Sequence, residues 1–376
     1  LYTGSKDGSI VKWDLSLSKK VKVFPGGRKG TSGFPGHTDH VLALAVSSDG
    51  RYMASGGRDR AIHIWSVQDD KLLTTFRQHK DGISGLVFRK GSNQLYSASL
   101  DRSVKVWNID QLSYIETLFG HQDVINAIDA LAKEHCMTAG ARDRTIRLWK
   151  IVEETQLVFR GGGSGVKKSA QTETNAETAA VPEDPVLEGS VDCVAMVNEE
   201  YFVTGGDSGM IALWHTGRKR PVFSQPMAHG LDEESGSKQP RWITAVTALR
   251  YSDLFATGSW DGVVRLWQIS ADMRQFSLVG TIAMPGFVNS LQFVEPQSNA
   301  LASSAGILLV AGLGQEHRFG RWLRLGKAKN AARVVQLTWR KGATVPQAAA
   351  LRHGVKRRRR ATHGSDSDEG VDIGDL

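Results

Sequence analysis

One short phrase returns seven times along the chain, and this repeat limits the possible fold more than any other feature. In most copies two segments rich in β-branched residues flank a turn, and an acidic turn residue precedes a Trp by six positions. The clearest copies are Thr3–Leu15, Ser55–Val67, Ser97–Ile109 and Thr257–Ile269, and the others are Ala139–Ile151, Thr204–Thr216 and Gly312–Leu325. Each phrase supplies half of a four-stranded sheet, and Trp65 and Trp107 are separated by 42 residues, close to the ~40–45 expected of one blade. The repeat therefore predicts an all-β, seven-bladed β-propeller.

A second constant spacing explains the polar residues of the repeat. In three copies a His stands 22 residues before the Asp, an offset that implies a fixed contact. In WD-repeat blades such a His forms a buried hydrogen-bonded chain with the Asp, a strand hydroxyl and the Trp, which is stabilising only if every member is satisfied. The predicted sets are His37, Ser55, Asp59 and Trp65; His79, Ser97, Asp101 and Trp107; and His121, Asp143 and Trp149, with Ala139 at the hydroxyl position.

The later copies depart from this pattern. The fifth has Ser208 in place of the Asp and no matching His, and in the sixth His229 lies ten residues too early. In the seventh, Glu316 replaces the Asp six residues before Trp322. We therefore expect the fourth to sixth blades to depend more on apolar packing.

The propeller is predicted to span residues 1–340. Leu1 falls inside the second strand of the first blade, so that blade lacks its N-terminal strand, and we expect a preceding segment in the natural protein. The last blade is predicted to have four strands: Val288–Val294, Leu308–Ala311, Arg321–Leu325 and Arg333–Trp339.

Two segments lie outside the propeller pattern. Residues 160–187 have the composition of a flexible insertion between blades four and five, and the Gly-rich start lacks the spacing of a phosphate-binding loop. Residues 341–376 are predicted to be a disordered tail, basic and then acidic. Its run Lys356, Arg357, Arg358, Arg359 and Arg360 resembles a nuclear import signal, with a solvated charged tail as the alternative. Ser365 precedes Asp366 and Asp368, a pattern typical of acid-directed phosphorylation sites.

Composition narrows the class of protein. The 376 residues contain two cysteines, too few for a disulfide framework, which favours a reducing compartment. No signal peptide or sufficiently long apolar run is visible, so we expect a soluble intracellular protein without a membrane segment. No nucleophile, acid–base or metal-binding motif is found, and the His37 and His40 pair is explained by the blade network. We predict a recognition protein that is not an enzyme and has neither cofactor nor metal.

The charge distribution suggests what is recognised. The formal net charge is +8, and the tail from Arg352 contributes six basic and five acidic residues, so most of the surplus lies on the folded part. Basic residues flank the repeated Asp turns, which should emerge on one face; they are Lys6, Arg58, Arg60, Arg102, Arg142 and Arg144. Trp260 occupies an equivalent turn, and further basic clusters are Arg218, Lys219 and Arg220, and Arg318, Arg321 and Arg324. This mixture suits phosphate contacts and base stacking, although each Arg could instead pair with an acid of a neighbouring blade.

Several stretches are more specific than the repeat. Gly140–Gly162, Ser190–Trp214, Trp242–Trp267 and Leu309–Trp322 closely resemble the WD-repeat proteins specific to U3 small nucleolar ribonucleoproteins. The resemblance runs from the second blade to the seventh. It implies a nuclear, nucleolar, non-enzymatic subunit, monomeric within a large complex. Its expected partners are U3 small nucleolar RNA, a small kink-turn-binding protein and other box C/D and processome proteins.

The implied role is pre-rRNA processing within the small-subunit processome, leading to 18S ribosomal RNA. The alternative is a WD-repeat scaffold that binds an acidic or phosphorylated peptide in another nuclear complex, because the same basic face would serve both ligands.

Overall fold

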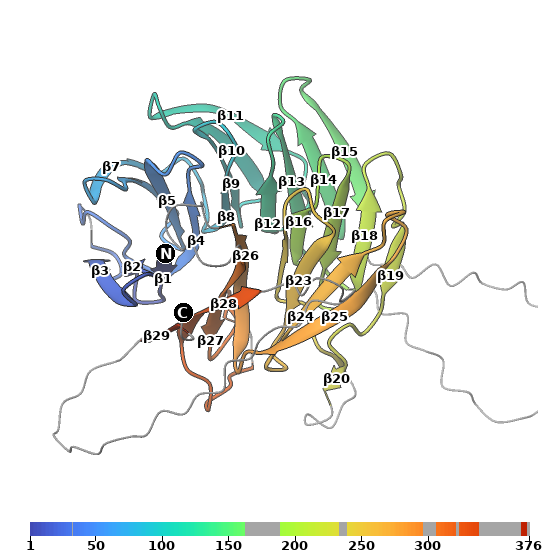
Figure 1. Cartoon of the computed structure of the whole chain (residues 1–376). Helices are drawn as coiled ribbons and strands as arrows, with labels where there is room; N and C mark the ends of the chain where they lie inside the picture. Colours follow the sequence, from blue (N-terminus) through green and yellow to red (C-terminus); the bar gives the residue numbers. More distant parts are fainter. Residues whose placement is uncertain are drawn as a thin grey trace, which may run out of the picture.

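Short β-branched segments joined by tight turns form antiparallel hairpins along almost the whole chain of the computed structural model. The sheets follow one another in chain order around a common axis, from the blue first blade to the red last one (Figure 1). The structure describes residues 1–31, 33–161, 189–232, 239–295, 306–320 and 323–337, together with the main chain of 370–373. The architecture is the expected all-β, seven-bladed WD-repeat propeller.

The first four blades follow one another along residues 1–160. Blade 1 contains β1 (Tyr2–Gly4), β2 (Ile10–Asp14) and β3 (Lys19–Phe24). Blade 2 contains β4 (Val41–Val46), β5 (Tyr52–Gly57), β6 (Ile62–Ser66) and β7 (Lys71–Phe76). Blade 3 contains β8 (Ile83–Phe88), β9 (Gln94–Ser99), β10 (Ser103–Asn108) and β11 (Ser113–Phe119). Blade 4 contains β12 (Ile125–Ala130), β13 (His135–Gly140), β14 (Thr145–Lys150) and β15 (Thr155–Arg160).

The remaining blades carry the larger insertions. Blade 5 contains β16 (Cys193–Met196), β17 (Tyr201–Gly205), β18 (Ile211–His215) and β19 (Phe223–Gln225). A two-stranded ribbon, β20 (Leu231–Asp232) and β21 (Gln239–Pro240), precedes blade 6, which contains β22 (Ala245–Ala248), β23 (Leu254–Gly258), β24 (Val263–Ile269) and β25 (Phe276–Ala283). Blade 7 contains β26 (Phe287–Val294), β27 (Ile307–Gly314), β28 (Ala331–Leu337) and β29 (Gly370–Ile373).

The core lies between adjacent blades rather than at one central point. Ile64 and Phe76 of blade 2, for example, share a buried cluster with Leu95 and Trp107 of blade 3. The ring closes between its ends, where Leu1 and Leu15 of blade 1 pack against a buried cluster of blade 7 that contains Leu308. Each blade thus buries its apolar faces only by stacking on its neighbours, as expected of a repeat fold.

Blade 7 differs from the prediction in two ways. The third strand is β28, which pairs with β27, and residues 323–325 of the predicted third strand contain only one isolated bridge, between Arg324 and Glu316. Arg321 and Trp322 lie outside the described residues. The fourth strand is β29, which pairs parallel with β28, so the expectation of a disordered tail is wrong for these four residues. Main-chain pairing at the edge of β28 overrides the polar composition of the tail. The other residues of the tail lie outside the described part of the chain.

The inner strands of four blades contain a β-bulge at the same place. The register of pairing shifts around Leu42 in β4, Ser84 in β8, Asn126 in β12 and Asn289 in β26. A bulged residue is left out of the ladder, so its carbonyl or side chain can bond elsewhere.

Blade 1 has three strands in its sheet, as the position of Leu1 within the repeat leads one to expect. Cys136 and Cys193 are both buried and are not joined by a disulfide. Among the described residues there is no helix of the length and apolarity needed to cross a membrane.

Candidate nucleic-acid interface

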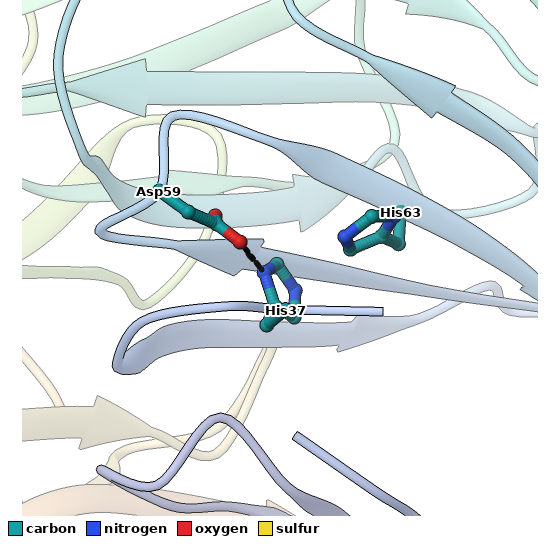
Figure 2. A group of neighbouring side chains, drawn as sticks. All are labelled: His37, Asp59 and His63. Carbon is teal, nitrogen blue, oxygen red and sulfur yellow. Dashed lines mark hydrogen bonds and ion pairs between the residues drawn. The ribbon is translucent and has the colours of Figure 1, made fainter. Parts of the chain in front are cut away.

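The hydrogen-bonded chain predicted for blades 2 and 3 is present in full. In blade 3, Trp107 Nε1 donates to Ser97 Oγ at 2.8 Å, Ser97 Oγ and His79 Nε2 are 2.8 Å apart, and His79 Nδ1 lies 2.9 Å from an Asp101 oxygen. Blade 2 repeats this with Trp65, Ser55, His37 and Asp59 (Figure 2 shows the His37 to Asp59 bond). Because a carboxylate can only accept, Nδ1 of each His donates to the Asp. These residues fasten the loop that enters each blade to the turn between its second and third strands.

Blade 4 contains a complete network, which corrects the expectation based on Ala139. Thr138 Oγ1 accepts from Trp149 Nε1 at 2.8 Å and lies 2.8 Å from His121 Nε2. Thr138 pairs with Arg147 as Ser97 pairs with Lys105, so it occupies the equivalent position in the strand. The segment between the hydroxyl residue and the Asp is one residue longer in blade 4 than in blade 3. The spacing taken from blade 3 therefore pointed to Ala139 instead of Thr138. Burial alone would raise the pKa of Asp143, but hydrogen bonds from His121 and Thr145 lower it to about 2.

Blade 6 is also complete, although its His stands 32 residues before the Asp. His229 Nδ1 lies 2.9 Å from Asp261, His229 Nε2 lies 2.9 Å from Thr257 Oγ1, and Trp267 donates to the same hydroxyl. The ten extra residues fall in the stretch that contains the β20 and β21 ribbon, and the His still reaches its partners. The prediction that this blade lacks the network is wrong, because spacing along the chain does not measure distance in space.

In the described parts of blades 5 and 7 the network is not complete. In blade 5, Trp214 still donates to Thr204, and Asp207 accepts from the main-chain N–H of Ser190 without a His between them. In blade 7, Ala311 pairs with Arg333 at the position that Ser97 holds in blade 3, and Val335 stands where Trp107 would. Apolar packing is therefore the main support of blade 7.

One set of side chains in the described residues could in principle offer metal ligands, namely His37, Asp59 and His63. Figure 2 shows His63 beside the bonded pair. His37 and Asp59 already bond each other, and His63 Nδ1 is 2.8 Å from Thr75 Oγ1. Burial, together with the neighbouring His37, lowers the pKa of His63 to about 3, so the ring is neutral at pH 7. We assign this set to the stability of blade 2.

The basic turn residues share one face, here named the Asp-turn face. It is formed by the turns that join β1 to β2, β5 to β6, β9 to β10, β13 to β14, β17 to β18 and β23 to β24. In successive blades the turn bonds the entering loop in the same way, with Arg58 N donating to His40 O, Leu100 N to Gly82 O and Ala141 N to Val124 O. Because each blade repeats the same strand directions around the axis, these turns lie on the same side of the ring.

Three arginines of this face adopt an unusual backbone conformation. Arg60, Arg102 and Arg144, each directly after the Asp, have φ of 64°, 70° and 56°, whereas Gly8, Gly209 and Gly262 hold the same place in other blades. The left-handed region costs a non-glycine residue roughly 1–2 kcal/mol, which glycine avoids. Three turns therefore hold an Arg in a strained conformation at a position where other blades have Gly.

The predicted basic residues differ in their exposure to solvent and in their interactions with other side chains. Arg58, Arg60, Arg102 and Arg142 are exposed, as are Arg218, Lys219 and Arg220 in the connection between β18 and β19. Lys6 forms an ion pair with Glu316, and Arg144 has further interactions of its own. Trp260 is partly covered by Arg241, whose guanidinium lies 5.4 Å from the ring centroid, so it is not an open stacking platform. Arg321 and the tail residues 356–360 and Ser365 lie outside the described residues.

The structure corrects the prediction that Arg318 belongs to a basic surface cluster. Its guanidinium crosses to the inner strands of three other blades, donating to the main-chain oxygens of Leu42 at 3.1 Å, Ser84 at 2.9 Å and Asn126 at 2.7 Å. These are the bulged residues, whose carbonyls the ladder leaves free. Burial lowers the pKa of Arg318 to about 10, and the group stays charged at pH 7. Arg318 therefore ties blade 7 to blades 2, 3 and 4 and is not available as a surface cation.

The chain is similar in sequence to a known repeat family and to several known proteins. The family model described as WD domain, G-beta repeat matches residues 28–66, 70–108, 112–150 and 235–268. Human U3 small nucleolar RNA-interacting protein 2 is 48% identical over 338 residues, which are 90% of this chain and 64% of that protein. Ribosomal RNA-processing protein 9 of Saccharomyces cerevisiae is 36% identical over 370 residues, covering 86% of this chain and 64% of that protein. The chain thus spans a little under two thirds of the length of these relatives.

A solved structure, described as that of U3-55K, superposes with a TM-score of 0.74 at 47% identity and covers 88% of this chain and 89% of that chain. A crystal structure of the RRP9 WD40 repeats gives the same TM-score and identity. The chain therefore belongs to the U3 small nucleolar RNA-interacting (U3-55K/Rrp9) family of WD-repeat proteins.

Proposed function

We propose that this propeller is a non-enzymatic subunit of the U3 small nucleolar ribonucleoprotein that acts in ribosomal RNA processing. The similarity to a human U3 small nucleolar RNA-interacting protein and to a yeast ribosomal RNA-processing protein supports this proposal. The finer assignments are release of the 18S precursor within the small-subunit processome, a nucleolar location in the nucleus, and contact with a kink-turn-binding protein and other box C/D proteins.

The observation that carries the RNA assignment is the set of guanidinium groups on the Asp-turn face. Arg58, Arg60 and Arg102 are exposed on consecutive blades, and two of them sit at strained left-handed positions. Guanidinium groups spaced by one blade can contact successive phosphates of a backbone that follows the ring, which favours binding by shape and charge. In this arrangement a neighbouring protein supplies the sequence readout.

The proposal is tested by ultraviolet crosslinking in cells, with sequencing of the attached RNA and mapping of the crosslinked peptides. We expect U3 RNA to be enriched and the crosslinks to lie in the Asp turns. Enrichment of no specific RNA would contradict the proposal.

Two triple variants with the same change in charge test whether the Asp-turn face binds RNA. Arg58→Glu, Arg60→Glu and Arg102→Glu together should weaken binding of a U3 transcript and lower the slope of its salt dependence by about 2 to 3, since each of the three lost phosphate contacts removes roughly 0.7 to 0.9 from the slope. The control is Arg51→Glu, Lys71→Glu and Arg274→Glu, exposed residues at the other end of the strands. Equal effects of the two triples would show that the wrong face had been chosen. Tighter binding of a phosphorylated peptide than of RNA would favour the peptide-binding alternative.

A further inference from the structure

A cavity of about 550 Å³ opens beside the outer half of blade 4. Three basic residues line it from three different elements: Arg147 from β14, Arg160 from the end of β15, and Lys219 from the connection between β18 and β19 of blade 5. Val158 of β15 provides an apolar wall and is 37% exposed. The volume falls within the roughly 300–1,000 Å³ typical of sites for small ligands.

The positive charge of this cavity is only partly offset by its neighbours. Among the described residues, no carboxylate lies within ion-pair distance of Arg147, Arg160 or Lys219. Arg147 Nη1 donates to the neutral amide oxygen of Gln156 at 2.7 Å, and its buried Nε has no partner. Burial lowers the pKa of Arg147, the carboxylate of Asp143 opposes that shift, and the like charge of Arg160 lowers it further.

Asp143 also lines the cavity, but its carboxylate is already engaged. It accepts hydrogen bonds from His121 at 2.7 Å, from the main-chain N–H of Thr145 at 2.8 Å and from that of Gln122 at 3.1 Å. Its single negative charge offsets part of the charge of the three cations and leaves the cavity with a net positive charge. The cavity therefore keeps hydrogen-bond donors and positive charge that an anion would satisfy.

Other blades show what is particular to blade 4. At the position two residues before the repeat Trp, blade 6 has Arg265, which forms an ion pair with Asp261, and blade 2 has His63, which is neutral at pH 7. Blade 3 has Lys105, which donates to the hydroxyl of Thr117. Arg147 of blade 4 differs from these residues because Arg160 and Lys219 line the same cavity, so that three cations are gathered at one place.

We propose that the blade 4 pocket, defined by Arg147, Val158, Arg160 and Lys219, binds one nucleotide of a single-stranded RNA segment. The three cations hold its phosphodiester, and Val158 and the arginine side chains contact the base or sugar. This inference rests on the proposed function and adds to it a contact outside the Asp turns.

The test compares two double variants with the same change in charge. Arg160→Glu with Lys219→Glu alters the pocket. Arg77→Glu with Arg274→Glu is the control, because Arg77 follows buried Phe76 of β7 as Arg160 follows buried Phe159 of β15, and Arg274 lies in the connection between β24 and β25 as Lys219 lies between β18 and β19. All four residues are exposed, so both variants should keep the thermal unfolding midpoint of the wild type.

Fluorescence anisotropy with a labelled 12-nucleotide oligouridylate and with a U3 transcript gives the affinities over a series of salt concentrations. We expect the pocket variant to raise the Kd for the oligonucleotide at least tenfold and to lower its salt slope by about 0.7, since the pocket holds one phosphate and each phosphate neutralised on a single strand contributes about 0.7. The control should change the Kd less than threefold.

Equal losses of affinity in both variants, or no loss in the pocket variant, would overturn the assignment of the pocket. The proposed function would still hold if the wild type binds the U3 transcript. Wild-type protein that binds neither RNA would overturn both. A phosphoserine peptide that binds the wild type more tightly than the oligonucleotide, and loses affinity only in the pocket variant, would reassign the pocket to a protein ligand and so also overturn the inference.

Discussion

Blades 3 and 7 occupy equivalent places in one ring but are held together by different forces. In blade 3, Trp107 is fully buried, stacks on Phe76 with ring centroids 4.4 Å apart and ends the chain of hydrogen bonds through Ser97 and His79 to Asp101. In blade 7 the corresponding positions are Ala311 and Val335, and the polar contact is made by Arg318 with three other blades. A blade therefore needs stacking against its neighbours more than it needs its own internal network.

Removing the Trp of blade 3 should have the largest effect. We expect Trp107→Ala to lower the free energy of unfolding by about 3–5 kcal/mol, because it leaves a cavity and deprives Ser97 of a donor. Val335→Ala at the equivalent position of blade 7 should cost less than half as much. Denaturant unfolding of both variants measures the difference, and equal losses would mean that the two blades do not differ as described.

Removing the guanidinium of blade 7 should have the next largest effect. Arg318→Met keeps much of the side-chain volume but leaves the carbonyls of Leu42, Ser84 and Asn126 without their donor, so we expect a loss of about 2–3 kcal/mol. Arg324→Met is the control, because Arg324 is exposed in the same connection. If both variants unfolded at the same denaturant concentration as the wild type, the contacts of Arg318 would not be stabilising.

Blade 4 allows a test of which residue supplies the hydroxyl. Thr138→Val should cost about 1–2 kcal/mol, because His121 and Trp149 lose their shared partner. Adding Ala139→Ser to that variant should not restore stability, since residue 139 points to the other face of the strand. Recovery of the unfolding midpoint in the double variant would show that position 139, and not Thr138, supplies the hydroxyl.

The smallest effect at neutral pH is expected in blade 2, where a His replaces the Lys or Arg of other blades. Burial lowers the pKa of His63 to about 3, whereas the unfolded chain takes up a proton near pH 6.5. Stability from the neutral ring is therefore present above pH 6.5 and is lost as the pH falls from there toward 3. His63→Gln should reduce the loss between pH 6 and pH 4 by up to about 1.4 kcal/mol per pH unit, measured by urea unfolding. An unchanged slope would contradict the lowered pKa.

Much of the fold could be predicted because the repeat is local. The strand, turn and Trp of each phrase lie within 13 residues, and the buried sets of blades 2 and 3 follow from a constant spacing. The same reasoning failed at Thr138 and His229, where one extra turn residue or ten loop residues changed the spacing without changing the contact. Loop length costs little free energy, so the chain tolerates such insertions while the partners still meet.

The candidate interface was predicted less well. The sequence placed the turn arginines on one face, since they share a position in the repeat, but it could not separate exposed Arg102 from Arg318, whose partners lie more than 190 residues away along the chain. Nor did it single out Arg147 and Arg160, which become a cluster only when two strands and a loop of the next blade come together. The sequence by itself determined the number of blades and the networks whose members keep a fixed spacing. Only the tertiary structure decided which cations are neutralised, buried or left free, because charge pairing depends on distances between blades that no local pattern contains.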